Sequence, residues 1–219
     1  MHERTNHCVS MKDLQALVLK GQLPQRLAMC PCPVCSGCLF GKAHKRPRRY
    51  KCDKKSMQKK DKSLKPGNFI SVDTFYFSVD GLIPQSKKIM MHDKFTAGTA
   101  FVGHASDYVY THFQIDQSTD ASITAKEAFE RNMAQVSVTV KRYHADNGIF
   151  ASKGFVLHIE ASNQHIDDCG VGAHFQIGIA KNPIKINTGN GCTMHIHAMY
   201  RWPEVIKANL WPFAVALAY

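Results

Sequence analysis

The sequence predicts an α/β protein: a mixed β-sheet flanked by helices, preceded by a small helical module with a His2Cys2 set of metal ligands. Two observations predict this fold class. Strand-forming segments begin near residue 69 and are followed by a helix, a strand and a second helix, an order typical of a mixed sheet. Six of the eight cysteines precede residue 53, close to two N-terminal histidines. Hydrophobic residues make up 44% of the 219 residues, which is enough for a buried core.

The first 66 residues divide into a compact module and a linker. Residues 1–41 are expected to hold one short helix that Ser10 caps and that ends at Gly21 and Pro24. Its apolar residues recur at helical spacing: Met11, Leu14, Leu17 and Val18. Residues 42–66 are basic and almost without apolar side chains, which is typical of a linker. Residues 67–219 are predicted to form the main domain.

Within the main domain, the residue types and their periodicity predict each element. β-Branched and aromatic residues predict a strand at 69–77, and similar segments predict strands at 87–92, 99–103 and 108–115. Residues 120–135 have one apolar face and predict a helix. A strand is expected at 136–143, a turn at Asp146-Asn147-Gly148, and a second helix at 150–159. Cys169 and Cys192 are expected to be buried thiols.

The N-terminal histidines and cysteines have the spacing of zinc ligands. His2 and His7 form an H-x4-H pair, and Cys35 and Cys38 form a C-x2-C pair. Zn²⁺ takes four such ligands in a tetrahedron. A module of about 40 residues has a small core, so a bound metal ion would explain how it folds. The alternative is a set of reduced cysteines without a metal. Cys30 and Cys32 leave the ligand set open, since either could replace one of the four.

Two aspartates stand in positions that favour metal binding. Asp73 lies within a predicted strand between apolar residues, and Asp146 follows a second one. A carboxylate on a buried strand is costly unless it is paired or binds a cation, and two of them could hold Mg²⁺ for phosphoryl transfer. The alternative is structural: Asp146 caps a turn and Asp73 forms a salt bridge.

The excess positive charge is concentrated in one segment. The formal net charge is +11, yet Lys42 to Lys65 alone contains 12 basic and two acidic residues. Such a basic strap predicts a polyanionic partner, above all nucleic acid; a solvated linker and a nuclear-import signal are the alternatives. The candidate contacts are Lys42, Lys45, Arg46, Arg48, Arg49, Lys51, Lys54 and Lys55.

No signal peptide and no apolar run of membrane-spanning length is found in the sequence. We therefore expect an intracellular protein, nuclear or cytoplasmic, with no membrane partner.

Taken in order, these motifs resemble a copia-type retrotransposon integrase. The resemblance covers essentially the whole chain and is carried by separate segments. Cys35–Pro47 is similar to the end of the pre-integrase zinc domain, and Tyr143–Gly148 to the segment around the second catalytic acid. Cys169–Gln176 is similar to the stretch before the third acid, and His197–Pro203 to the helix that follows it.

The resemblance implies an RNase H-like integrase catalytic core that processes DNA ends and joins them to target DNA. It implies Asp73 and Asp146 as the first two acids of an Asp, Asp, Glu triad that binds Mg²⁺ or Mn²⁺. It also implies His2, His7, Cys35 and Cys38 as ligands of a structural Zn²⁺. DNA, both element ends and target, and other copies of the chain would be the partners.

The sequence departs from this family at the third acid. The position 35 residues after Asp146 is Lys181, a positive charge where the family has Glu. We expect a large loss of Mg²⁺ affinity and no polynucleotidyl transferase activity, since like charges about 4 Å apart repel by several kcal/mol at an effective dielectric near 20. Glu160, Asp167 or Asp168 could replace the lost acid only from a different spacing.

The helix after the third acid position is also expected to be broken. Interior prolines and glycines disfavour a helix, and this segment contains Pro183, Gly189, Asn190 and Gly191. With a broken helix, Lys181→Glu alone is expected to restore little. The family comparison further predicts that the chain is truncated at both ends.

Three hypotheses follow from these features. The first is an integrase-derived protein without strand-transfer activity. The second is a non-catalytic, zinc-stabilised nucleic-acid-binding protein. The third is a transposon relic that folds poorly, because loss of the long helix would leave one face of the sheet exposed.

Overall fold

The structure is a computed structural model that describes residues 2–3, 7, 9–32, 34–43, 63–83, 94–170, 178–201 and 208–218. Its strands are β1 (Ile70–Gly81), β2 (Phe95–Gly103), β3 (Val109–Gln114), β4 (Arg142–Ala145) and β5 (His165–Asp168). Its helices are α1 (Met11–Leu19), α2 (Ser36–Gly41), α3 (Thr119–Gln135), α4 (Lys153–Ala161), α5 (Gly178–Arg201) and α6 (Trp211–Ala218). Three short 3₁₀ turns lie at Gln25–Leu27, Ile149–Ala151 and Ala208–Leu210.

The residues divide into two compact units. One consists of Met1–Arg46 together with Ile186–Ala218, and the other of Pro47–Lys185 with the last residue, Tyr219. The residues of α5 fall partly in each. These units differ in their bounds from the predicted domains 1–41, 42–66 and 67–219, and those domains stay a prediction.

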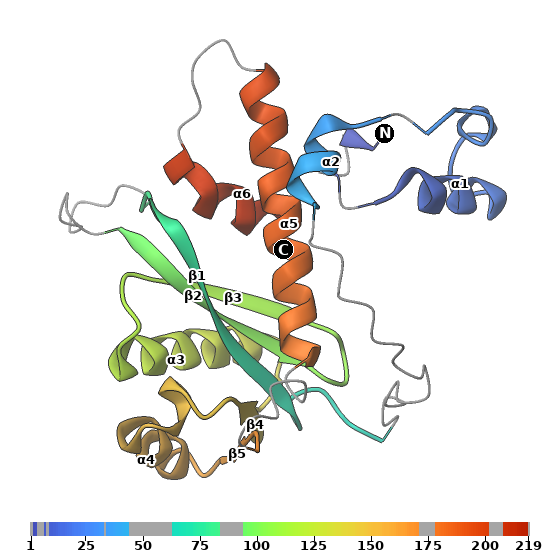
Figure 1. Ribbon diagram of the computed structural model, residues 1–219. Coiled ribbons are helices and arrows are strands. Elements are labelled where there is room, and N and C mark those ends of the chain that lie inside the picture. Colours follow the sequence, from blue (N-terminus) through green and yellow to red (C-terminus); the bar gives the residue numbers. More distant parts are fainter. Residues whose placement is uncertain are drawn as a thin grey trace. The chain divides into compact units, whose positions relative to one another are not determined.

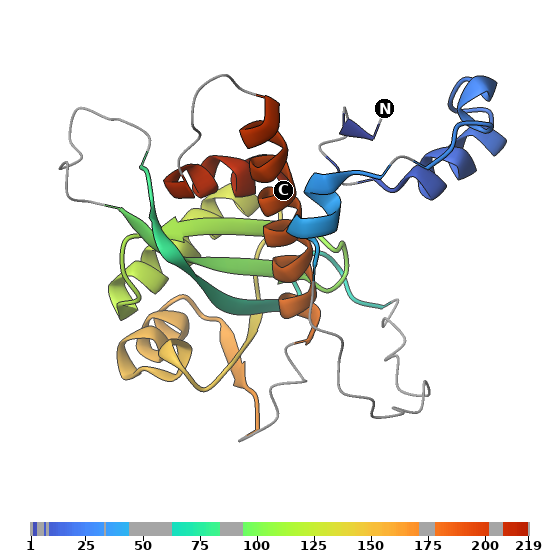
Figure 2. The ribbon, with the colours of Figure 1, turned by 45° about the horizontal axis from the view of Figure 1, so that its top comes forward.

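The second unit contains a five-stranded mixed sheet of order β3-β2-β1-β4-β5. The first three strands in the chain pair antiparallel, and β4 and β5 add in parallel beside β1. Figures 1 and 2 show β1, β2 and β3 as long neighbouring strands with α3 alongside them. This is the predicted mixed α/β architecture, and the arrangement of its strands follows from the mixture of hairpin and crossover connections.

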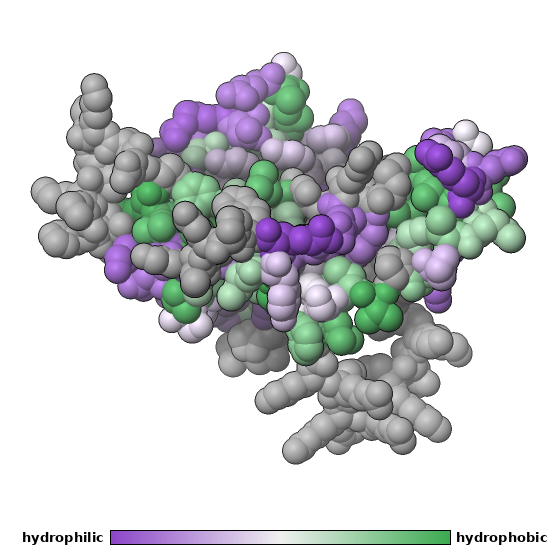
Figure 3. Space-filling model, turned by 90° about the horizontal axis from the view of Figure 1, so that it is seen from above, coloured by the Kyte–Doolittle hydropathy of each residue, from purple (hydrophilic) through white to green (hydrophobic). Residues whose placement is uncertain are grey.

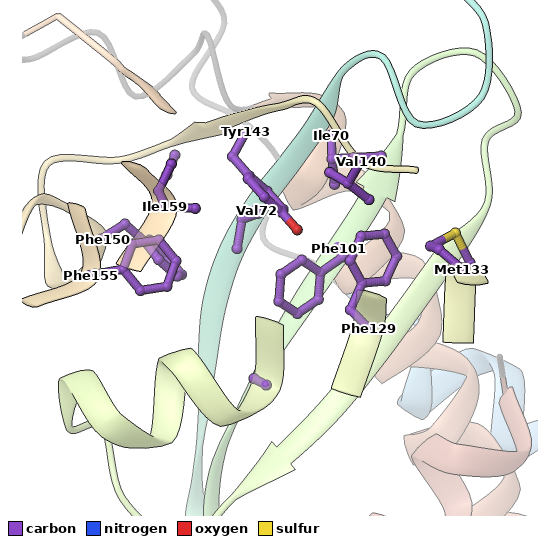
Figure 4. Close-up of a cluster of buried hydrophobic side chains, with 12 residues drawn as sticks. Ile70, Val72, Phe101, Phe129, Met133, Val140, Tyr143, Phe150, Phe155 and Ile159 are labelled. Atoms are coloured by element: carbon purple, nitrogen blue, oxygen red, sulfur yellow. The ribbon is translucent and has the colours of Figure 1, made fainter. Parts of the chain in front are cut away.

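Alternation along the strands separates the two faces of the sheet. Val72 and its partner Phe101 point into the main hydrophobic core, where Phe101 stacks on Phe129 of α3 at a centroid distance of 4.6 Å. Figure 4 shows these side chains with Tyr143 of β4. Since successive residues face opposite sides, Asp73 and Val102 lie on the other face. There Val102 packs with Cys169 and with Ala180 of α5.

A buried polar network closes the core beneath α3. The side chain of Lys126 is fully buried and pairs with Glu130 at 3.1 Å. The Tyr143 hydroxyl and the Gln164 amide both donate to the same Glu130 oxygen, at 2.6 and 2.7 Å. Burial and the Glu130 carboxylate hold the pKa of Tyr143 far above its usual value, so it remains a donor. The charge of Lys126 is therefore compensated, as a buried charge must be.

Most predicted elements of the main domain are confirmed, and some boundaries are wrong. α3 matches the predicted helix 120–135, and β1, β2 and β3 overlap three predicted strands. The strand predicted at 136–143 begins only at Arg142, because Val136 and Ser137 still belong to a turn that ends α3 and Ser137 has a φ of 57°. The helix predicted at 150–159 is a 3₁₀ turn followed by α4. The strand predicted at 87–92 lies outside the described residues.

The predicted break after Lys181 is wrong, because α5 runs without interruption from Gly178 to Arg201 and includes Pro183. Pro183 is its sixth residue, so only one early intrahelical hydrogen bond is lost there. The glycines have a packing role. A Cβ on Gly191 would lie 2.8 Å from a methyl group of Val215 in α6. This close approach offsets the low helix propensity of glycine. The hypothesis of a poorly folded relic assumed that this helix is lost, whereas the structure contains it.

In the first unit, α1 is confirmed where it was predicted. The Ser10 side chain accepts a hydrogen bond from the Asp13 amide at 3.2 Å, and Leu14 and Val18 form the buried face. Cys192, predicted to be buried, is exposed. Figure 3 shows hydrophobic and hydrophilic side chains intermingled on one face of the described residues. Among those residues, no helix is both long and apolar enough to cross a bilayer.

Candidate metal-binding site and acidic site

The four predicted zinc ligands come together in the first unit. The ligand atoms of His2, His7, Cys35 and Cys38 all lie within 4.8 Å of one another. Within the described part of the chain, this is the one group of three or more His, Cys, Asp and Glu side chains close enough to share an ion. His2 and His7 come from the N-terminal residues, and the two cysteines flank the start of α2. The predicted His2Cys2 cluster is thus present.

The distances within this cluster fit a tetrahedral ion. His2 Nε2 lies 3.3 Å from His7 Nδ1 and 3.1 Å from Cys38 Sγ. His7 Nδ1 lies 3.4 Å from Cys35 Sγ and 3.5 Å from Cys38 Sγ. Zinc bonds of about 2.0 Å to nitrogen and about 2.3 Å to sulfur set these ligand atoms about 3.3–3.6 Å apart. The donor atoms and their spacing therefore fit Zn²⁺.

A hydrogen bond orients His2, and burial and neighbouring groups favour the neutral form of His7. The Nδ1 atom of His2 lies 2.8 Å from the Val9 carbonyl, so it donates there and leaves Nε2 as the lone-pair nitrogen. Burial lowers the pKa of His7, and the neighbouring His197 and His2 lower it further. The backbone amide of Lys42 donates to the Cys38 carbonyl at 3.1 Å, and its side-chain ammonium donates to the His7 carbonyl at 2.6 Å. His7 is also held in a left-handed backbone conformation with φ of 61°.

The surroundings of Cys38 favour the protonated form of its thiol. Burial raises the pKa of Cys38, and the adjacent Cys35 raises it further, whereas Lys42 lowers it. Cys32 lines the same cavity of about 410 Å³ as the four ligands, while the Cys30 thiol donates to the Arg26 carbonyl at 3.3 Å. Neither Cys30 nor Cys32 belongs to the convergent group.

The two predicted catalytic acids belong to neighbouring parts of the sheet in the second unit. β1 and β4 pair in parallel, with Ile70 opposite Tyr143 and Ser71 opposite His144. Asp73 lies two residues further along β1, and Asp146 directly follows the last residue of β4. The Cys169 amide, directly after β5, donates to the Ala145 carbonyl at 3.0 Å and so continues the pairing of β4 with β5. Asp146 and Cys169 therefore follow the ends of two neighbouring parallel strands, and extending the β1–β4 register by two residues would place Asp73 opposite Asp146.

The two carboxylates differ in exposure. Asp73 is 7% exposed, and one of its oxygens accepts from the Thr74 amide at 3.0 Å. Asp146 is half-buried, and one of its oxygens accepts from the Gly148 amide at 3.2 Å in the predicted turn. The predicted turn role of Asp146 is therefore present.

Lys181 is an exposed residue in the first turn of α5. Its neighbour Ala180 is fully buried against Val102 and Cys169, which fixes the first turn of α5 against the sheet. Burial raises the pKa of the Cys169 thiol most, Asp146 raises it further, and Lys181 lowers it; Asp168 and Asp73 contribute smaller increases. Three acids and one lysine thus act on one buried thiol.

The sequence did not single out the contact between Cys169 and His144. Cys169 Sγ lies 3.2 Å from His144 Nε2, and His144 stacks on Phe69 at 5.7 Å between ring centroids. Strand alternation was the available signal, because His144 precedes Asp146 by two residues and shares its face. The expected burial of Cys169 is confirmed.

The basic strap is only partly described. Lys42 donates to the His7 carbonyl, so its ammonium supports a ligand-bearing loop. The other candidate contacts lie outside the described residues: Lys45, Arg46, Arg48, Arg49, Lys51, Lys54 and Lys55. Of the acids considered as replacements, Asp167 pairs with Arg142, and Glu160 is exposed on α4.

Comparison with known proteins identifies the fold. No family model and no curated protein matches the chain. The chain does match several solved structures. A chain of the simian T-cell lymphotropic virus intasome in complex with PP2A regulatory subunit B56 gamma aligns with a TM-score of 0.50 and 15% identity. The alignment covers 91% of this chain and 62% of the intasome chain, so this protein spans less than two thirds of it.

Two further structures are similar over a smaller part of the chain. The HTLV-2 integrase catalytic core domain in complex with magnesium, in its trimeric form, is 14% identical with a TM-score of 0.45, over 71% of this chain and 84% of that one. The BIV integrase catalytic core domain is 11% identical with a TM-score of 0.42, over 69% and 80%. The alignment with the intasome chain, at a TM-score of 0.50, shows that the mixed sheet and its helices have a similar fold.

Proposed function

We propose that the protein is an integrase-derived, nucleic-acid-binding protein of copia type, with a structural Zn²⁺ at its N-terminal site and no strand-transfer activity. The observation that carries the proposal is the acidic site. The β1–β4 register, extended by two residues, would set Asp73 opposite Asp146, which supports their assignment as the first two acids of an integrase triad. Lys181, at the position where the resemblance expects the third acid, is in the first turn of α5 and acts electrostatically on the same thiol as both acids.

The residues of this site do not fit a two-metal centre. Mg²⁺ or Mn²⁺ in such a centre would stabilise the attacking and leaving oxygens of a phosphoryl transfer. Two carboxylates are hard oxygen ligands suited to these ions, but the ammonium of Lys181 is a competing cation. Asp168 acts on the Cys169 thiol, as Asp73 and Asp146 do. Its partner on β4 is Ala145, however, so Asp168 is one position short of Asp146. We therefore assign no catalytic step to this chain.

The deciding experiment is an end-processing and strand-transfer assay with Mg²⁺ and with Mn²⁺. We expect no joining of labelled DNA ends by the wild-type chain under either condition. Asp73→Asn serves as the control that detects a contaminating nuclease, because any activity that survives this change does not come from the site. Joining that disappears in Asp73→Asn would show an active integrase and overturn the proposal.

A second candidate, favoured by the basic strap, is a zinc-stabilised nucleic-acid-binding protein whose binding does not depend on the acidic site. Lys42 to Lys65 carries 12 basic residues and one aromatic residue, Tyr50, so we infer phosphate contacts rather than base stacking. Homo-oligomers of the chain would multiply these contacts. Binding to a random duplex should weaken steeply with salt, with a slope of about −0.9 for each phosphate neutralised. A variant with Lys54 and Lys55 changed to Gln should have a shallower slope, and an unchanged slope would remove the strap from the interface.

A further inference from the structure

The His/Cys cluster is packed against a distant part of the sequence within the same unit. The ring of His7, a proposed ligand that is 2% exposed, lies 4.7 Å from the ring of His197 in α5. His197 Nε2 lies 3.9 Å from a Glu3 oxygen, and Arg201 donates to the Glu3 carboxylate at 3.1 and 3.3 Å. Glu3 adjoins His2 in the sequence. His197 and Arg201, one turn apart on α5, thus contact the ligand His7 and Glu3, the neighbour of the ligand His2.

A second contact between the same segments is made by small residues. On α2, which begins directly after the ligand Cys35 and contains Cys38, Gly37 and Gly41 face Thr193 of α5. A Cβ on Gly41 would lie 2.5 Å from Thr193 Oγ1 and 2.6 Å from its backbone nitrogen. Real Cβ atoms do not approach backbone so closely, so a side chain on Gly41 has to move α2 away from α5.

We propose that metal binding at the His/Cys cluster is coupled to the packing of α5 residues 189–201 against α2, with His197 and Glu3 as positioning residues. The inference rests on the proposed zinc site. Both ligand pairs take part: His7 contacts His197, and the cysteines are carried by the helix that packs on Thr193. A contact that orients a ligand raises metal affinity, and groups outside the ligand set commonly contribute about 10–100-fold.

The coupling must act in both directions. If packed α5 favours the ligand geometry, bound metal favours the packed helix by the same factor. Zinc would therefore order residues from two ends of the sequence. The segment that completes the metal module is absent from residues 1–41, so a module cut at residue 41 would bind metal more weakly than the full chain.

Two glycines that face each other across this contact provide a matched test. Gly41→Ala forces Cβ into Thr193, whereas Gly189→Ala places its Cβ 3.7 Å from the Gly41 carbonyl and 3.9 Å from Lys42, which is ordinary contact. Zinc affinity of the full chain is measured by competition with a chelator, and the ligand field by the absorption of the Co²⁺ form. We expect Gly41→Ala to weaken zinc binding about tenfold or more and Gly189→Ala to change it less than about threefold.

Two further measurements keep the test decisive if Gly41→Ala does not fold. His197→Ala should weaken zinc binding and shift the Co²⁺ absorption, and His197→Phe, which keeps a ring against His7, should recover most of the affinity. In the wild type, zinc should slow amide exchange in residues 189–201. Wild-type zinc affinity in both Gly41→Ala and His197→Ala, or exchange that zinc does not change, would overturn the coupling while leaving the zinc site intact. A wild-type chain that binds no zinc would overturn both.

Discussion

The His/Cys cluster and the acidic site are both predicted metal sites, and they differ in how complete they are. In the first, four ligand atoms converge and the nitrogen of His2 that does not face the cluster has a backbone acceptor. In the second, the extended β1–β4 register would set two acids opposite each other, but the residue that should complete the set is Lys181. A structural ion needs only its ligands, whereas catalysis needs every charge in place. The comparison therefore sets a site whose four ligand atoms converge against one whose proposed third position is a lysine.

Removal of zinc should have the largest effect of any change considered. Cys38→Ser, or a strong chelator, should increase amide exchange in α1 and α2, because a structural zinc contributes about 10 kcal/mol or more to the folding of its module. Exchange in β1 and β2 should remain slow, since those strands belong to the other unit. Cys30→Ser is the control, because Cys30 lies outside the ligand group. Equal exchange in the presence and absence of chelator would contradict a structural metal.

Lys181→Glu tests the acidic site directly. Because α5 is continuous, the expectation of little restoration no longer applies to metal binding, and charge is the remaining obstacle. We expect Mg²⁺ affinity to rise at least about tenfold, measured by titration calorimetry, as a third carboxylate replaces an ammonium. Lys185→Glu makes the same charge change one turn further along the helix and should have a smaller effect. If the two variants bind Mg²⁺ equally, Lys181 does not belong to the site.

The sequence predicted the metal cluster well because its ligands come in close pairs. The H-x4-H and C-x2-C pairs each bring two ligands close together at a small cost in loop entropy, so their spacing alone restricts which residues can share one ion. The acids were found through their strands, since an aspartate between apolar residues stands out. The contact of His144 with Cys169 joins residues on neighbouring strands, and only the pairing of β4 with β5 creates it.

The errors have physical causes that the sequence alone does not contain. β5 was missed because His165–Asp168 holds one apolar residue, and its partner β4 rather than its own propensity makes it a strand. The break in α5 was predicted from the cost of glycine in isolated helices. In the structure Gly191 packs closely on Val215, a tertiary contact that a larger residue would prevent. Propensity is therefore outweighed where close packing requires glycine.

Neutralising Asp73 in the acidic site should affect stability much less than loss of a zinc ligand. In buffer without divalent ions, Asp73→Asn should change the free energy of unfolding of the sheet unit by no more than about 1 kcal/mol. The change removes both repulsion from Asp146 and attraction to Lys181, and it keeps an acceptor for the Thr74 amide. Urea unfolding at low and high salt measures it. Glu160→Gln, on the exposed face of α4, should change stability by only a few tenths of a kcal/mol. A loss of several kcal/mol in Asp73→Asn would contradict this balance of charges.

Cys169→Ala should have the smallest effect and tests whether the acidic site and α5 are one packed structure. The Cys169 thiol is 4% exposed, contacts Ala180 and lies 3.2 Å from His144 Nε2. Its removal leaves a small void and frees a half-buried imidazole that water can reach, so we expect a loss of about 0.5–1 kcal/mol in urea unfolding. Cys192→Ala, at an exposed position, should cost less. An equal cost at both positions would mean that the first turn of α5 is not anchored through Cys169, and Lys181 would then have no fixed place beside the acids.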